Sequence, residues 1–143
     1  MNDIFLQYLE TGHLHTYRIN KQFKKGPDTV FENETSMGFK HYAVDDFYCI
    51  AVDIETNRVF RIGVYVWDKG FISFLREQLS CVKLTLRKVL DYCDKHSLDW
   101  QIEQGWSFSK QVAVRLKSGV TFIFSVDKRN DMVLRKIDIA FHG

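Results

Sequence analysis

The chain has 143 residues, a formal net charge of +2, 45% hydrophobic residues and 15% aromatic residues. This composition excludes a disordered chain, and the length suits one globular domain, which we expect to span residues 1–143. No apolar run reaches the roughly 20 residues that a transmembrane helix needs, so we expect no membrane partner. The small net charge neither requires nor excludes nucleic acid as a partner.

The cysteine content bears on the cellular compartment. Three cysteines occur at positions 49, 81 and 93, an odd number without paired spacing. This count argues against a disulfide scaffold and indicates reduced thiols. The first 15 residues lack a basic stretch followed by a long apolar one, so we expect no secretory signal. Both observations favour a cytoplasmic protein.

The first part of the chain predicts two helices. Apolar residues at 4, 5, 8 and 9 have helical spacing, and Gly12 is suited to end this first helix. A second helix is expected from about His13 to Lys25, where the sequence KKGPD would stop it.

The rest of the chain predicts antiparallel strands around one clear helix. Thr85 is a suitable cap for a helix over residues 86–98, whose apolar stripe recurs every three or four residues. Alternation over residues 47–54 predicts a strand whose core face carries Tyr48, Ile50, Val52 and Ile54. Residues 29–38 fit a loop or a weak strand, and residues 68–83 mix apolar and charged residues in a pattern that allows a helical turn. Further strands are expected over residues 40–46, 58–67, 99–106, 110–117, 120–127 and 132–141.

Two hairpins in the chain have similar sequences. VDIETNRVFR, residues 52–61, aligns with VDKRNDMVLR, residues 126–135, with identical Val, Asp, Val and Arg residues. Each hairpin follows a predicted helix, so the chain reads as a helix plus antiparallel strands, twice; a true duplication and a chance likeness of strand-forming residues both remain open. In either case we predict the α+β class, with helices packed on antiparallel sheet.

Two pairs of side chains are candidates for catalysis or metal binding. His13 and His15 are two residues apart, so on a helix their rings would point in different directions, and no further ligand has zinc spacing. Cys93 and His96 could meet on one helix face, but Cys93 lies on the apolar stripe, where a buried, unreactive thiol is expected. We therefore expect no catalytic residue, no metal and no cofactor, and a binding protein rather than an enzyme.

An acidic group formed by Asp45, Asp46, Asp53 and Glu55 is the first candidate surface for a partner. Carboxylates of this kind could meet a basic cleft in another protein. Their positions at strand ends and turns also fit ordinary solvated carboxylates, so both interpretations remain open.

Aromatic residues in the irregular segment form the second candidate surface. Trp67, Phe71 and Phe74 are large apolar groups outside a regular pattern, as is typical of interfaces, although a large aromatic core would also use them. The basic stretches KQFKKG and VKLTLRK lie on separate predicted helices and are better explained as solvated faces than as a nucleic-acid surface.

Four stretches occur in an order known from one class of bacterial protein. A Gly-led segment ends in Gly-Pro, a sheet with an aromatic and an acidic residue follows, then a helix leads into a strand, and the closing strands contain a Ser-Gly-Val turn. These stretches are GHLHTYRINKQFKKGPD, HYAVDDFYCIAVDIETNRVFRIGVYV, LTLRKVLDYCDKHSLDWQIEQ and VAVRLKSGVTFIFSVDKRNDMVLRKIDIAF. Together they resemble immunity-type proteins of polymorphic-toxin and contact-dependent growth inhibition systems.

The resemblance implies a cytoplasmic antidote that binds the toxic domain of a cognate effector and covers its active or substrate-binding surface. It names no contact residue. The alternative from the residues alone is a small nucleic-acid-binding or regulatory domain, given the pI of about 8.4 and the many aromatic residues.

Overall fold

The computed structural model describes residues 2–142, without the side chains of Asn2 and Trp106. The chain divides into two compact units. The first runs to Tyr65 and resumes at Asp138, and the second is Val66–Ile137. Strand β8 (Met132–Ala140) therefore begins in the second unit and ends in the first. The prediction of a single domain stays a prediction.

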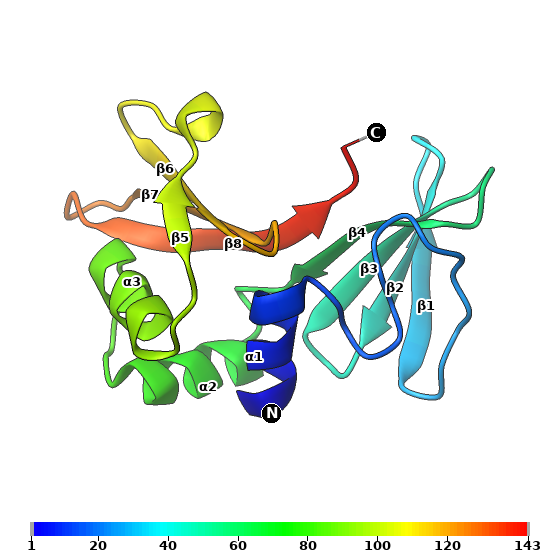
Figure 1. Ribbon diagram of the computed structural model, residues 1–143, viewed down its shortest axis with the longest axis horizontal. Coiled ribbons are helices and arrows are strands. Elements are labelled where there is room, and N and C mark those ends of the chain that lie inside the picture. Colours follow the sequence, from blue (N-terminus) through cyan, green and yellow to red (C-terminus); the bar gives the residue numbers. More distant parts are fainter. Residues whose placement is uncertain (1, 143) are drawn as a thin grey trace. The chain divides into compact units, whose positions relative to one another are not determined.

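The first unit contains one helix and four strands that pair in sequence order (Figure 1). Each strand is antiparallel to the next, and Phe141, just after β8, donates its amide to the carbonyl of Phe60, 2.8 Å away. The elements are α1 (Asn2–Thr11), β1 (Thr29–Glu34), β2 (Phe39–Val44), β3 (Tyr48–Asp53) and β4 (Val59–Val64).

Helix α1 supplies one layer of this unit's core. Phe5, Tyr8 and Leu9 are fully buried, as their helical spacing predicts. The Tyr8 hydroxyl donates to the carbonyl of Ile62 on β4, 2.8 Å away, which fastens the helix to the sheet. Gly12 ends the helix with φ of 75°, the left-handed conformation that glycine adopts without strain.

The predicted helix from His13 to Lys25 is wrong. This segment consists of turns and isolated bridges instead, and it pairs with the start of β4, where the amide of Asn20 donates to the carbonyl of Val59 and the amide of Val59 donates to the carbonyl of Lys21. His15 and Asn20 have positive φ, which a right-handed helix does not allow. Pairing with the β3–β4 turn satisfies the backbone groups that helical bonds would have used.

The central strand β3 is buried on both faces rather than on one. Tyr48, Ile50 and Val52 are buried as predicted, but Cys49 and Ala51 on the opposite face are buried as well. Ile54 is exposed because the strand ends one residue before it, at Asp53.

The second unit contains two helices, a sheet in the order β8-β7-β6-β5, and a short 3₁₀ turn (Figure 1). Helix α3 begins after Thr85, whose hydroxyl accepts a bond from the amide of Lys88, as the capping pattern predicts. Its stripe of Val89, Tyr92 and Cys93 is buried. The elements are α2 (Lys69–Leu79), α3 (Leu86–Lys95), β5 (Trp100–Ile102), η1 (Gln104–Trp106), β6 (Gln111–Leu116), β7 (Thr121–Val126) and β8.

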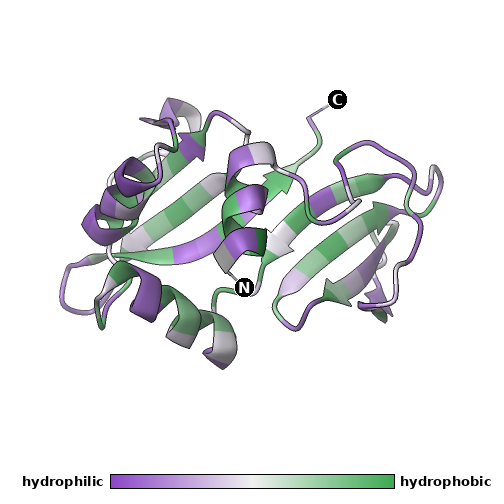
Figure 2. Cartoon of the chain, turned by 60° about the horizontal axis from the view of Figure 1, so that its bottom comes forward, coloured by the Kyte–Doolittle hydropathy of each residue, from purple (hydrophilic) through white to green (hydrophobic). Residues whose placement is uncertain are grey.

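The irregular segment of the sequence is a helix of three turns, α2, where the pattern allowed only a helical turn. Asp68 caps its first turn by accepting from the amide of Phe71, 3.0 Å away, and Ser80 ends it in the left-handed conformation. Phe71, Leu75 and Leu79 recur every four residues and are buried. Figure 2 shows the resulting alternation of hydrophobic and hydrophilic residues along both helices of this unit and the mostly hydrophobic strands.

The protein belongs to the α+β class, with helices packed on antiparallel sheet, as the sequence predicts. The two similar hairpins are β3–β4 and β7–β8, but no helix occupies residues 13–25 before the first. The fold therefore lacks the helix that was predicted before the first hairpin, and it has the helix that was predicted in the second half, α3. Over residues 2–142, no helix has the length and apolar character required to cross a membrane.

Candidate functional site

The four residues of the acidic group do not form one surface. Asp45 and Asp46 lie in the β2–β3 turn, whereas Asp53 and Glu55 lie at the β3–β4 turn. These turns are at opposite ends of β3, a strand of six residues that spans about 17 Å. The prediction that these carboxylates gather on one patch is wrong, because residues close in sequence are separated by the length of an extended strand.

Three of these carboxylates belong to the turns themselves, and a histidine contacts one of them. Asp45 and Asp46 both have positive φ, and the Asp45 carboxylate contacts the Nε2 atom of His15. The Oδ1 atom of Asp53 accepts the amides of Glu55 and Thr56, 2.9 and 3.3 Å away, in a side-chain turn. Local turn geometry therefore accounts for them without a partner.

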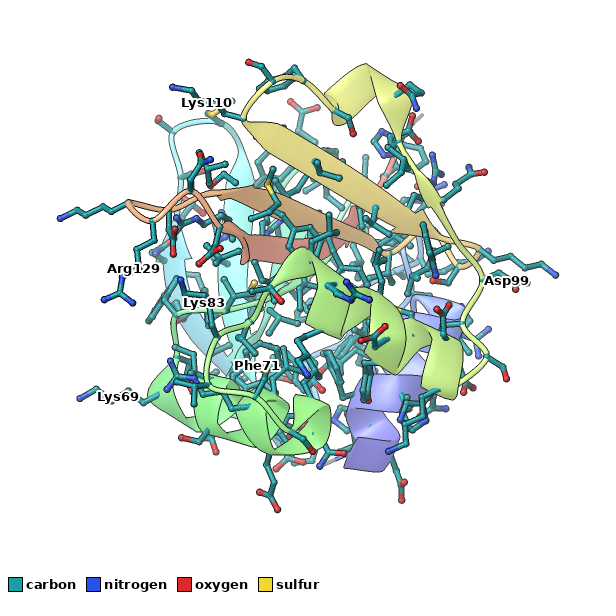
Figure 3. All side chains as sticks on the ribbon, turned by 90° about the vertical axis from the view of Figure 1, so that its left-hand side faces the viewer. Lys69, Phe71, Lys83, Asp99, Lys110 and Arg129 are labelled. Atoms are coloured by element: carbon teal, nitrogen blue, oxygen red, sulfur yellow. The ribbon has the colours of Figure 1, made fainter. Side chains whose placement is uncertain are left out.

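The three predicted aromatic contact residues have different environments. The side chain of Trp67 is 71% exposed, Phe74 is half-buried, and Phe71 is 0% exposed. Figure 3 shows Lys69 extending outward from α2 while Phe71, two residues later, lies toward the interior. Phe71 as a contact residue is wrong, because it shares the buried stripe of α2 with Leu75.

Trp67 borders a groove of about 520 Å³ that lies wholly within the second unit. We call it the Trp67 groove. Val82 is 80% exposed, so two large apolar side chains of this groove face solvent. A volume of this size is typical of ligand-binding clefts. The groove is lined by Val66, Trp67, Ile72, Arg76, Val82, Lys83, Leu84, Val133, Leu134 and Arg135.

Local structure brings together three segments that are distant in sequence. Helix α2 starts at the Asp68 cap, and the left-handed Ser80 turns the chain back toward the strand. The amide of Leu134 on β8 then donates to the carbonyl of Leu84, 2.9 Å away, and Thr85 pairs with Val133. These backbone bonds hold the wall formed by residues 82–84 beside β8.

An ion-pair network fixes the same loop. The Nζ atom of Lys83 lies 2.8 Å from a carboxylate oxygen of Asp127 and 2.6 Å from one of Asp131. The hydrogen bond from Lys83, together with backbone amides of the turn, lowers the pKa of Asp127 to about 2. Two carboxylates of the β7–β8 turn are therefore paired with the single charge of Lys83 and more than offset it.

The two arginines of the groove differ from Lys83 in their partners. The Nε atom of Arg135 donates to the hydroxyl of Ser125, 2.8 Å away, a neutral partner. Within residues 2–142, no carboxylate lies at ion-pair distance from Arg76 or Arg135. The groove is therefore apolar along its walls and positively charged at these two residues.

The catalytic and metal candidates of the sequence have no reactive geometry in the described residues. Cys93 is fully buried, and its burial raises the pKa of the thiol to about 12, so the thiol is protonated at neutral pH. The ring of His96 packs on Tyr92, with centroids 4.5 Å apart. No group of three or more His, Cys, Asp or Glu side chains among the residues that the structure describes is arranged to hold a metal ion.

A second hollow of about 310 Å³ lies at the outer strand β5. Trp100 donates from Nε1 to the carboxylate of Asp94, 2.8 Å away, and is less exposed than Trp67. Arg115 in this hollow lies 3.6 Å from a carboxylate oxygen of Glu103, so the two charges offset each other. This hollow is more polar and more neutral than the Trp67 groove.

Sequence reasoning identified Trp67 but missed Val82, Arg76 and Arg135. These residues come from a helix, a loop and a strand, and nothing in their local patterns links them. Comparisons of the chain with models of protein families, with curated proteins and with solved structures find no match. The functional argument therefore rests on the geometry and charge of the groove.

Proposed function

We propose that the chain is a non-enzymatic protein-binding module, an antidote that neutralises a cognate bacterial toxin domain by covering its active or substrate-binding surface. The observation that carries the proposal is the Trp67 groove, in which Trp67 and Val82 are 71% and 80% exposed. Exposed aromatic residues beside an apolar cleft are typical of protein interfaces, where tryptophan and arginine supply much of the binding energy.

The resemblance of the sequence to immunity-type proteins supports the toxin as the partner and the bacterial cytoplasm as the site of action. Binding by occlusion needs a surface and no catalytic group, which agrees with a buried Cys93 of raised pKa.

A second candidate is nucleic-acid binding, favoured by Arg76 and Arg135 beside Trp67, since bases stack on aromatic rings and phosphates pair with arginine. The walls of the groove are mostly aliphatic, and only two of its three cations are free of carboxylates. Phosphate recognition uses several aligned cations, so the protein partner is the better fit.

Co-expression tests the antidote function. The chain is produced in bacteria together with the domain encoded by the adjoining reading frame, and survival is compared for the natural chain, the double variant Trp67→Ala/Val82→Ser and the control Met37→Ser. Met37 is 82% exposed in the first unit, so its replacement removes an exposed apolar group away from the groove.

We expect the natural chain and the control to protect and the groove variant to lose protection while keeping its circular dichroism spectrum. Absence of both protection and complex formation by the natural chain would contradict the antidote function. Full protection by the groove variant would place the contact surface elsewhere.

A further inference from the structure

We propose that the occupant of the Trp67 groove is an apolar segment of a partner protein that carries carboxylates. This inference rests on the proposed function and specifies the chemistry of the partner. The alternative partner is a protein with a basic cleft, which would need a continuous acidic surface. The acidic group does not provide one, because its residues lie at the two ends of β3.

The charge of the groove selects acidic groups. Its three charged lining residues, Arg76, Lys83 and Arg135, are all basic. Lys83 is held by two carboxylates, Asp127 and Asp131, so this cluster carries a net negative charge and does not attract acidic groups. Arg76 and Arg135 are not offset, and their field reaches about 8 Å at physiological salt. Arginine pairs with carboxylate through two parallel bonds, which gives specificity as well as attraction.

The walls of the groove select apolar groups. Val66, Ile72, Leu84 and Val133 offer no side-chain donor or acceptor, so a polar occupant would lose its bonds to water without replacing them. Trp67, which lines the groove and is largely exposed, offers an aromatic face against which an inserted apolar side chain can pack away from water. A segment with a large apolar residue near one or two carboxylates satisfies both conditions.

A peptide selection tests this chemistry without any knowledge of the toxin. Random 12-residue peptides displayed on phage are selected on the natural chain and depleted on Trp67→Ala/Val82→Ser. The enriched peptides are then synthesised, and their affinity is measured by calorimetry at two salt concentrations.

Charge reversal gives the matched comparison. The double variant Arg76→Glu/Arg135→Glu is compared with Lys110→Glu/Arg129→Glu, which changes net charge equally. Lys110 and Arg129 are exposed residues of the second unit that do not line the groove, and their side chains point outward (Figure 3).

We expect enriched peptides that combine Trp, Phe or Leu with Asp or Glu. Their binding should weaken about tenfold or more in Arg76→Glu/Arg135→Glu and much less in the control. Replacing the peptide carboxylates by lysine should restore binding to the reversed groove. A circular dichroism spectrum and denaturation midpoint close to those of the natural chain confirm that each variant folds.

Any one of the following results would overturn the proposal. The first is enrichment of basic or uncharged peptides, or equal loss in both charge variants. The second is displacement of the peptide by a single-stranded oligonucleotide whose own binding falls steeply with salt, which would identify nucleic acid as the occupant. The third is groove-dependent self-association in sedimentation, which would identify a second copy of the chain. Because the selection uses no toxin, its outcome is independent of the co-expression result.

Discussion

The three cysteine side chains illustrate how local environment sets reactivity. Cys49 and Cys93 are buried, and burial raises the pKa of both thiols. For Cys49 this effect outweighs Arg61, whose guanidinium contacts the sulfur at 3.7 Å and favours the thiolate. Cys81, in the loop after α2, is partly exposed.

Only Cys81 should therefore react quickly with a thiol reagent in the native protein. Titration with Ellman's reagent should give one fast equivalent, and the remaining two should appear only after denaturation, since the reagent needs an accessible thiolate. Cys81→Ser should remove the fast phase and leave the slow one. Three fast equivalents in the folded protein would contradict this assignment.

The Lys83 network makes a prediction about pH. The pKa of Asp127 is lowered from an ordinary value of 3.8 to about 2, and the largest cause is the hydrogen bond from Lys83. A carboxylate with a lowered pKa in the folded state stabilises it above the unfolded pKa. That contribution is lost as pH falls from about 4 toward 2.

In Lys83→Met the Asp127 carboxyl should titrate at a higher pH, measured by NMR of its side-chain carbon. It should remain somewhat below the ordinary value because the amides of Arg129 and Asp131 still donate to it. Lys128→Met, a change at an exposed residue of the same turn, is the control, and it should leave the pH at which Asp127 titrates unchanged. Identical curves for Lys83→Met and the natural chain would show that the ion pair does not form in solution.

At the scale of elements, helix α2 positions one wall of the groove. Its first turn depends on the Asp68 carboxylate, which accepts from the amide of Phe71. Asp68→Ala should destabilise the protein by about 1 kcal/mol, the usual cost of losing such a cap, measured by urea denaturation. Asp68→Ser keeps an acceptor and should recover most of the loss. Equal midpoints for Asp68→Ala and the natural chain would mean that the cap contributes nothing.

The elements that sequence predicted well are those whose stability is local. Helix α3 combines a Thr85 cap with an apolar stripe, and both appear in the structure. The segment from His13 to Lys25 has helix-like spacing too, but its backbone bonds go to the β3–β4 turn. Backbone pairing between residues as distant in sequence as Asn20 and Val59 cannot be read from a local pattern.

The candidate site was harder to predict for the same reason. Trp67 was identifiable as a large apolar residue outside a regular pattern. Phe71 has the same sequence character, but the four-residue spacing to Leu75 places it in the core. Val82 and Arg135 join the groove only because β8 pairs with the loop before α3. The acidic group shows the opposite case: its residues are close in sequence, but the extended strand β3 separates them in space.

At the scale of the whole molecule, strand β8 is shared by the two units. Its residues up to Ile137 belong to the second unit, and Asp138 onward belongs to the first. In the first unit the Asp138 carboxylate accepts from the Nε atom of Arg61, 2.6 Å away, and both side chains are half-buried. If the second unit unfolds, the strand that carries Asp138 loses its first part, so we expect the first unit to be destabilised as well.

The two units should therefore unfold in one transition, and the sequence supplies a separate probe for each. All three tryptophans fall within residues 66–137, so tryptophan fluorescence follows the second unit, whereas the NMR signal of His41 on β2 follows the first. Urea midpoints from the two probes should coincide. Asp138→Asn should weaken the Arg61 interaction and lower the free energy of unfolding by about 2 kcal/mol. Both urea midpoints should then fall together. Lys40→Asn, a polar change on β2 outside this ion pair, is the control. An earlier His41 transition with an unchanged fluorescence midpoint would show that the units unfold independently, and the prediction of one cooperative domain would then be wrong.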